Sequence, residues 1–153
     1  MVKSFQGVRV EKSKVPERQP ILVSDYMATE LITFRAEQTI SEVIEVLVHN
    51  RISGGPVIND KNELIGVISE GDCLKEVVKG KYDNIPILSG TVKDHMATNV
   101  ISISYETNIF EAAQMFLNRR LRRFPVIKYG KLIGQISQKD VMKAVIKMKS
   151  ASW

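Results

Sequence analysis

The sequence lacks the features of a disulfide-stabilised, secreted or membrane-spanning protein. Cys73 is the only cysteine among 153 residues, so no internal disulfide can form. No apolar run approaches the roughly 18 to 20 residues that cross a bilayer, and the start of the chain has no apolar core typical of a secretory signal. Because unpaired cysteines suit a reducing compartment, we expect a cytoplasmic protein. Its length and its 44% hydrophobic content fit one globular domain.

The sequence also lacks the arrangements that usually carry catalysis or bind a metal. It has no Ser/His/Asp set, no paired carboxylates at a repeated position and no Gly-rich phosphate loop. His49 and His95 do not have the spacing of metal ligands, and no second cysteine could join them. We therefore expect no enzyme, no metal and no cofactor, and we expect both histidines at the surface or at helix ends.

Positive charge exceeds negative charge, but the excess lies mostly near the two ends. The net charge is +5, of which residues 1–18 contribute +3 and residues 139–149 contribute +3, while residues 19–138 contribute −1. Basic ends are common on soluble proteins, and the motifs of nucleic-acid-binding families are missing. Nucleic-acid binding through the basic ends is therefore an alternative that we do not favour.

The chain does contain an internal repeat. From Asp25 to Val77, 20 of 53 positions are identical to positions 68 or 69 residues further on. This density predicts two structural copies. The matching segments are Asp25–Thr29 with Asp94–Thr98, Pro56–Ile58 with Pro125–Ile127, and Leu64–Asp72 with Leu132–Asp140. The predicted parts are an N-terminal extension (1–21), repeat 1 (22–79), a linker (80–91), repeat 2 (92–148) and a C-terminal tail (149–153).

Each repeat is predicted to have the order β-α-β-β-α. An extended piece comes first, and a helix follows that opens with a capping box, Thr39-Ile-Ser-Glu42 or Asn108-Ile-Phe-Glu111. A hairpin comes next, and a last helix starts at Ser69 or Ser137. One repeat is too small to bury its sheet and helices alone. The fold class is therefore predicted as α+β, with the two repeats packed about a pseudo-two-fold axis.

The repeated Gly-x-Ile-Ser-x-x-Asp motif has two interpretations. Ser followed three residues later by an acidic residue resembles a capping box. Alternatively, the strand delivers Ser to a helix N-terminus, where free N–H groups favour a phosphate, and Asp can accept hydrogen bonds from ribose hydroxyls. Asp stands at this position both times, although Glu reaches back to a cap better. The motif therefore also predicts a nucleotide site.

These motifs resemble the cystathionine β-synthase (CBS) domain family, as a tandem pair that stands alone. The resemblance rests on Asp-x-Met-x-Thr, Pro-Val-Ile and Gly-x-Ile-Ser-x-x-Asp, each present twice, and covers roughly residues 22–148. It implies a regulatory module that binds an adenosine compound (AMP, ADP, ATP, S-adenosylmethionine or an NAD-type dinucleotide) in clefts between the repeats. It also implies a homodimer that acts on a separate partner protein, which the sequence does not identify. A degenerate pair that serves only for dimerisation or docking is the alternative.

The resemblance further implies two crossed ligand sites. Arg123 matches a basic residue of the family, whereas repeat 1 has Gly54 in that place. We therefore expect the site that contains Arg123 to bind its ligand more tightly than the other site. The cluster of Arg119, Arg120, Arg122 and Arg123 can also be read as a solvated helix end. The first expected site comprises Ser137, Asp140, Ile136 and Arg123 with Ile32, Ile52, Ser53 and Gly54, near Met27 and Thr29. The second comprises Ser69, Asp72 and Ile68 with Ile101, Leu121 and Arg122.

Overall fold

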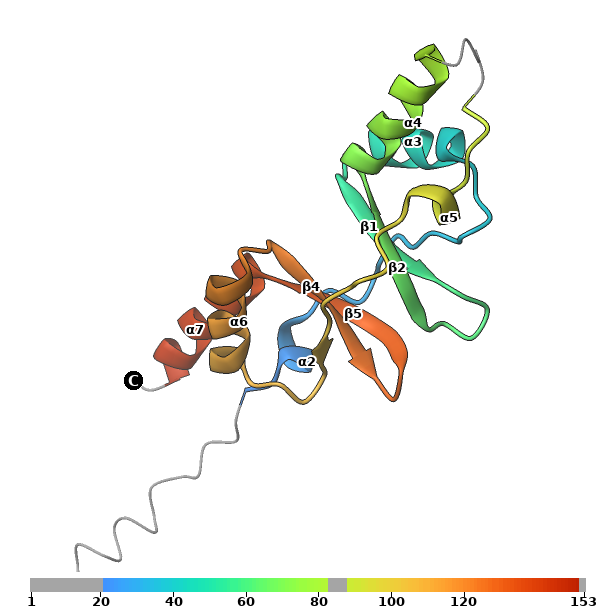
Figure 1. The fold of residues 1–153 in the computed structure, drawn as a ribbon. Helices are drawn as coiled ribbons and strands as arrows, with labels where there is room; N and C mark the ends of the chain where they lie inside the picture. Colours follow the sequence, from blue (N-terminus) through green and yellow to red (C-terminus); the bar gives the residue numbers. More distant parts are fainter. Residues whose placement is uncertain (1–20, 83–87, 152–153) are drawn as a thin grey trace, which may run out of the picture.

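The computed structural model describes residues 21–82 and 88–151 (Figure 1). Most of the predicted N-terminal extension with its basic residues, the middle of the linker and the end of the tail lie outside these residues. None of the helices within the described ranges combines the length and apolar character needed to cross a bilayer. The elements are α2 (Val23–Tyr26), α3 (Ile40–Asn50), β1 (Gly54–Ile58), β2 (Leu64–Ser69), α4 (Glu70–Tyr82), α5 (Val92–His95), β3 (Ile103–Ser104), α6 (Ile109–Arg119), β4 (Arg123–Lys128), β5 (Lys131–Ser137) and α7 (Gln138–Ala151).

The predicted α+β architecture is confirmed, and so are the two capped helices. Thr39 accepts a hydrogen bond from the Glu42 N–H at 3.1 Å, and Asn108 accepts one from the Glu111 N–H at 2.8 Å. These caps satisfy N–H groups that the first turn of a helix leaves without partners. Each hairpin is an antiparallel pair, β1 with β2 and β4 with β5.

Two details differ from the prediction. The extended pieces are shorter than expected: repeat 1 contributes one bridge, Phe34 to Val57, and repeat 2 contributes the two-residue strand β3 beside β4. The helix α4 continues to Tyr82, beyond the expected start of the linker at Gly80. Gly80 lowers helix propensity without ending a helix, because only its entropy cost opposes the helical conformation.

The start of each repeat packs on the other repeat, which sequence analysis did not predict. Val23 from α2 is buried in the core of repeat 2 with Ile109 and Phe124. Val92 from α5 is buried in the core of repeat 1 with Ile40 and Phe34. Figure 1 shows α2 beside the β4–β5 hairpin and α5 beside the β1–β2 hairpin. Neither repeat therefore has a complete core without the other.

We call this packing of the start of each repeat on the other repeat the exchange. Its backbone hydrogen bonds form two pairs at equivalent positions of the two repeats. Ala28 and Gln135 exchange two backbone hydrogen bonds of 2.8 and 2.9 Å, and Ala97 and Val67 exchange two of 2.9 Å. Glu63 and Lys131, which occupy equivalent positions, form a bridge with each other. The repeats are thus related by a pseudo-two-fold axis that passes near this last pair.

The exchange explains the glycine in Gly-x-Ile-Ser. A Cβ atom on Gly134 would lie 2.5 Å from Met27 Sδ and 2.8 Å from the Ala28 carbonyl oxygen. A Cβ atom on Gly66 would lie 2.7 Å from Met96 Sδ and 2.9 Å from the Ala97 carbonyl oxygen. Such distances are too short for a real carbon contact, so the Met-Ala segment needs glycine opposite it. The Asp-x-Met-x-Thr motif of each repeat therefore contacts the Gly-x-Ile-Ser motif of the other repeat.

One buried polar cluster joins α4 of repeat 1 to α5 at the start of repeat 2. Glu76 on α4 accepts a hydrogen bond from the Gly90 N–H at 2.7 Å, and its other oxygen lies 2.7 Å from His95 Nε2. His95 ends α5, as expected for a helix-end residue, but its side chain is only 14% exposed. The equivalent positions are occupied by Ala144 in repeat 2 and by Tyr26 at the start of repeat 1, so they cannot form the same cluster. The cluster therefore holds the end of the linker against α4 in one repeat.

We expect Glu76→Gln to destabilise the protein in a pH-dependent way. The hydrogen bond with His95, followed by that from Gly90, lowers the pKa of Glu76 below its ordinary value of 4.5. A depressed folded-state pKa stabilises the fold above the ordinary value, and this stability disappears as the pH falls through the folded pKa. The loss in unfolding free energy should be about 1–2 kcal/mol near neutral pH. Below pH ~4.5 the difference from wild type should shrink toward zero.

Urea denaturation between pH 3 and pH 7 measures this difference. The matched control is Glu37→Gln, because Glu37 is exposed and makes no side-chain hydrogen bond or ion pair among the described residues. A Glu76→Gln variant as stable as wild type at pH 7 would show that the cluster contributes nothing.

Candidate functional site

Both Ser-x-x-Asp motifs form capping boxes, so the structural interpretation of the motif is confirmed. The Ser69 N–H donates to Asp72 Oδ2 at 2.9 Å, and the Ser137 N–H donates to Asp140 Oδ2 at 2.9 Å. In return, the Asp140 N–H donates to Ser137 Oγ at 3.1 Å. The second carboxylate oxygen of Asp140 makes no hydrogen bond to the described residues. A capping role therefore leaves one oxygen available to a ligand.

A first cavity, of about 200 Å³, lies where the two repeats meet. It brings together Ile32, Ile52 and Gly54 of repeat 1 with Arg123 of repeat 2, as the crossed arrangement predicts. Ser137, Asp140 and Ile136 do not line it, and neither does Thr29. Met27 packs against Gly134 instead. The remaining lining residues are Ala28, Glu30, Leu31, Pro56 and Gln135.

A second cavity, of about 220 Å³, lies beside the first. It brings together Ser69 and Ile68 with Leu121 and Arg122, again as the crossed arrangement predicts. Asp72 and Ile101 do not line it, whereas Ser53, which sequence analysis assigned to the first site, does. The remaining lining residues are Gly54, Gly55, Pro56, Val67, Arg123, Pro125 and Gln135.

Arg123 lies on the wall that the two cavities share. It lines both of them, together with Gly54, Pro56 and Gln135. Sequence analysis assigned Arg123 to the first site only. The structure instead places Arg123 in the lining of both cavities, so the same cationic residue serves the two of them.

The difference between Gly54 and Arg123 has a steric cause. Gly54 pairs with Ser69 in the β1–β2 ladder, and Arg123 pairs with Ser137 in the β4–β5 ladder, so the two positions are equivalent. A Cβ atom on Gly54 would lie 2.5 Å from the Ile68 carbonyl oxygen. No side chain fits there, and repeat 1 therefore cannot supply its own cation from this position.

The arginines are suited to bind an anion. Arg122 and Arg123 are exposed, and neither forms an ion pair within the described residues. A guanidinium group can donate two parallel hydrogen bonds to one phosphate. Glu30 is the acidic residue on the wall of the first cavity. A ligand in these cavities would place its phosphate toward the arginines and away from Glu30.

Sequence analysis missed Glu30 and Gln135. Gln135 and Val67 both stand at the variable position of Gly-x-Ile-Ser, and both line the second cavity. The repeated motif was therefore a sequence signal from which the lining role of Gln135 could have been predicted. Glu30 carries no such signal, because its repeat 2 equivalent is Asn99 and neither belongs to a repeated motif.

Two other groups lie away from the cavities. Cys73 is buried between α3 and α4, and burial raises the pKa of its thiol, which fits the packing role that its Val141 counterpart suggests. Within residues 21–82 and 88–151, no group of three or more His, Cys, Asp and Glu side chains is arranged to hold a metal ion.

Comparison with known proteins agrees with the internal repeat. The family model described as "CBS domain" matches residues 23–79 and 92–147. Protein MJ1225 of Methanocaldococcus jannaschii is 28% identical over 79% of this chain and 41% of its own length. The chloroplastic CBS domain-containing protein CBSX1 of Arabidopsis thaliana is 28% identical over 90% of this chain and 69% of its own.

The fold has close counterparts among solved structures. The structure of CBSX2 in complex with AMP superimposes with a TM-score of 0.72 at 30% identity, covering 84% of this chain and 98% of that one. The match of the family model to both copies, together with this superposition, shows that the chain belongs to the CBS domain family.

Proposed function

We propose that this protein is a regulatory module that binds an adenosine nucleotide in the two cavities between its repeats and acts on a separate protein. The observation that carries the proposal is the placement of Arg123, which forms no ion pair with residues 21–82 or 88–151, on the wall shared by both cavities. The relative CBSX2, at 30% identity, has been solved with AMP bound. The proposed role is binding rather than catalysis, in the cytoplasm that the single cysteine predicts.

From the lining residues we propose a role for each part of such a ligand. Arg122 and Arg123 would bind the phosphate, while the apolar side chains of Ile32, Ile52 and Leu121 would cover the base. The cavities of about 200 and 220 Å³ are smaller than the roughly 300–1,000 Å³ typical of small-molecule sites. Their size favours a mononucleotide such as AMP over an NAD-type dinucleotide.

Two measurements on the full chain test this proposal. Mass spectrometry of small molecules that co-purify with the protein should detect an adenosine compound. Calorimetric titration with AMP, ADP, ATP, S-adenosylmethionine and NADH should then show tightest binding for a mononucleotide. If none of the five binds and nothing co-purifies, the nucleotide proposal is wrong and the alternative of a docking module without a ligand gains support.

We expect Asp140→Ala to weaken AMP binding by about 10- to 150-fold, which corresponds to about 1.5–3 kcal/mol for the loss of one hydrogen bond to a charged group. The free oxygen of Asp140 is the acceptor that the family resemblance assigns to the ribose. The matched control is Asp94→Ala, which removes a similar cap (Thr91 N–H to Asp94 Oδ2, 2.9 Å) on α5. Unchanged AMP affinity in a folded Asp140→Ala variant would exclude this role, and the two cavities described above would then bind without Asp140.

We also propose that the protein is a homodimer. The helices of both repeats expose apolar side chains, including Val48 (73%), Leu74 (61%), Leu117 (76%) and Ile146 (66%). Large apolar side chains exposed on helices are typical of association surfaces, and a closed two-fold dimer is the commonest assembly. Sedimentation equilibrium at tens of micromolar should give about twice the chain mass of 17.3 kDa. A single species at the monomer mass, with and without AMP, would exclude the dimer.

A further inference from the structure

A further cavity, of about 510 Å³, lies where the start of repeat 2 packs on repeat 1, and we call it the α5 cavity. The Lys93 N–H donates to the Ala36 carbonyl oxygen at 3.0 Å, and the Val92 N–H donates to that of Gln38 at 2.9 Å. These bonds hold α5 against the segment that precedes α3. The α5 cavity shares no lining residue with the two candidate nucleotide cavities. Its lining residues are Ala36, Glu37, Ile65, Thr91, Lys93 and Met96.

The other repeat shows which kind of group fits beside the apolar lining residues. Tyr105 stands in repeat 2 where repeat 1 has Ala36. The Tyr105 side chain is half-buried and packs against the core of repeat 2, as do Ile133 and Met27. Because the two repeats share one fold, Ala36 leaves room for an aromatic ring where repeat 2 supplies its own. The equivalent pairs are Ala36 with Tyr105, Ile65 with Ile133, and Met96 with Met27.

Two oppositely charged groups line the same cavity. Glu37 and Lys93 are exposed, and neither forms an ion pair with residues 21–82 or 88–151. The repeat 2 equivalent of Lys93 is Ser24, which carries no charge. A carboxylate binds an ammonium group, and an ammonium group binds a carboxylate, through charge-assisted hydrogen bonds. The α5 cavity therefore offers apolar surface for a ring and a partner for each charge of a zwitterion.

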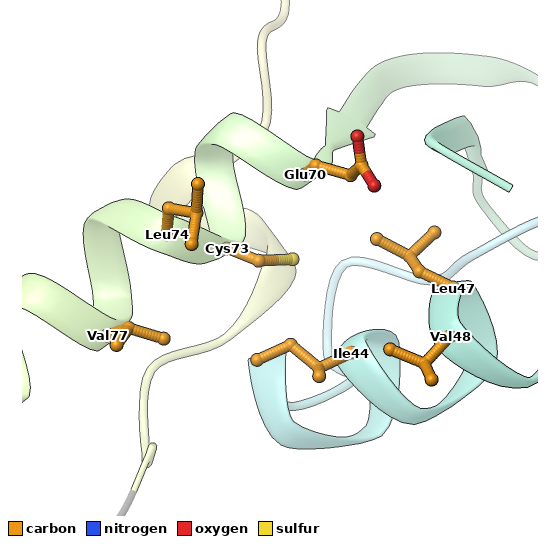
Figure 2. A pocket seen from close by; sticks show the side chains of 7 residues that line it. All are labelled: Ile44, Leu47, Val48, Glu70, Cys73, Leu74 and Val77. Atoms are coloured by element: carbon orange, nitrogen blue, oxygen red, sulfur yellow. The ribbon is translucent and has the colours of Figure 1, made fainter. Parts of the chain in front are cut away.

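The cavity between α3 and α4 does not offer this combination. Figure 2 shows Cys73 and Val77 on α4 pointing toward α3, with the Glu70 carboxylate at one end. The volume is about 410 Å³, and none of the lining residues is a lysine or an arginine. This second apolar cavity therefore lacks a partner for the carboxylate of a zwitterion.

We propose that the α5 cavity binds a free aromatic amino acid. The ring packs against Ala36, Ile65 and Met96. The α-ammonium group binds Glu37, and the α-carboxylate binds Lys93. The volume of about 510 Å³ lies within the roughly 300–1,000 Å³ typical of small-molecule sites, which combine apolar walls with a few polar groups. This site is additional to the proposed nucleotide function and does not depend on it, because the two sets of lining residues are separate.

Titration of L-phenylalanine into the full chain, with methyl-labelled methionine and isoleucine, tests the site by NMR. We expect saturable shifts of the Met96 and Ile65 methyl resonances. Phenylpropionate lacks the ammonium group and phenethylamine lacks the carboxylate, so each should bind about tenfold more weakly or worse than phenylalanine. Equal affinity for the three compounds would overturn the proposal, and so would the absence of shifts at about 10 mM phenylalanine.

Two surface variants assign the charged contacts. Lys93→Ala should weaken the binding of phenylalanine but not that of phenethylamine, which has no carboxylate. Glu37→Gln should weaken the binding of phenylalanine but not that of phenylpropionate, which has no ammonium group. Both side chains are exposed, so neither change threatens the fold. Wild-type affinity for phenylalanine in both variants would refute the recognition of a zwitterion.

A third variant, Ala36→Tyr, supplies the ring that repeat 2 has in this place. We expect it to abolish phenylalanine binding and to leave the affinity for AMP unchanged. Ser102→Tyr is the matched control, because it adds the same side chain at an exposed position that lines none of the four cavities described. Circular dichroism melting checks that both variants fold. Wild-type affinity for phenylalanine in Ala36→Tyr would show that the α5 cavity is not the site.

A blocked derivative distinguishes a free amino acid from a protein segment. N-acetyl-L-phenylalanine amide keeps the ring but removes both charges, so we expect it to bind about tenfold more weakly than phenylalanine or worse. Equal or tighter binding would overturn the assignment to a free amino acid in favour of an aromatic side chain of another protein. AMP titration of the same samples reports on the nucleotide proposal separately, so either proposal can fail without the other.

Discussion

Replacing Arg123 with alanine is expected to lower the affinity for AMP by about 10- to 100-fold, which corresponds to about 1–3 kcal/mol. Arg123 lines both cavities, and its guanidinium group has no acidic partner among the described residues, so we expect it to bind the phosphate in either one. Its loss leaves Arg122 in the second cavity and no arginine in the first. Adenosine, which lacks the phosphate, should bind the variant as it binds wild type.

Calorimetric titration of AMP and adenosine into both proteins measures this difference. Arg119→Ala is the matched control, because Arg119 is exposed at the end of α6 and lines neither cavity. Arg122→Ala should weaken AMP binding less than Arg123→Ala does, since Arg122 lines the second cavity and not the first. An unchanged ratio of AMP to adenosine affinity in Arg123→Ala would contradict the role of this arginine.

Replacing Gly134 with alanine is expected to lower the free energy of unfolding by about 2–3 kcal/mol. The added methyl group would lie 2.5 Å from Met27 Sδ and 2.8 Å from the Ala28 carbonyl oxygen. Met27 can move, but the Ala28 backbone is held by its paired hydrogen bonds to Gln135. Relief of the contact therefore requires that the start of repeat 1 shift away from repeat 2.

Chemical denaturation compares this variant with Gly71→Ala. Gly71 lies in the first turn of α4, and a Cβ atom there would meet only Ser69 Oγ at 3.8 Å. Alanine at that exposed helical position should stabilise the protein by about 0.5–1 kcal/mol. Equal stability of Gly134→Ala and wild type would mean that the exchange tolerates a wider separation than the structure shows.

Much of the local structure could be predicted from the sequence. The capped helices after Thr39 and Asn108, the two hairpins and the caps at Ser69 and Ser137 follow from patterns within about ten residues. Apolar residues at helical spacing in those helices, such as Ile40, Val43 and Leu47 in α3 and Ile109, Ala112 and Phe116 in α6, are buried in the core. Because each of these patterns occurs in both repeats, two separate segments of the sequence support each prediction.

The candidate site was predicted less completely. Ile32 and Ile52 line the first cavity and Ile68 and Leu121 line the second, as expected, because each lies in or close to a strand or bridge of the hairpins. The pairing of Ser137 and Asp140 with the first cavity remains a prediction. Glu30 was missed because its place depends on where the exchanged segment crosses the other repeat, which no local pattern records.

The sequence by itself determined the family, the two repeats, their secondary structure and the residue types that could bind a nucleotide, because each depends on short-range spacing. Only the tertiary structure decided that the starts of the repeats are exchanged, since that exchange rests on hydrogen bonds between residues such as Ala28 and Gln135, far apart in the chain. It also decided that Arg123 borders both cavities. The reason is geometric: β1 and β4 each contribute residues to the lining of both cavities, Gly54 and Pro56 from β1 and Arg123 from β4, so one residue can border two spaces.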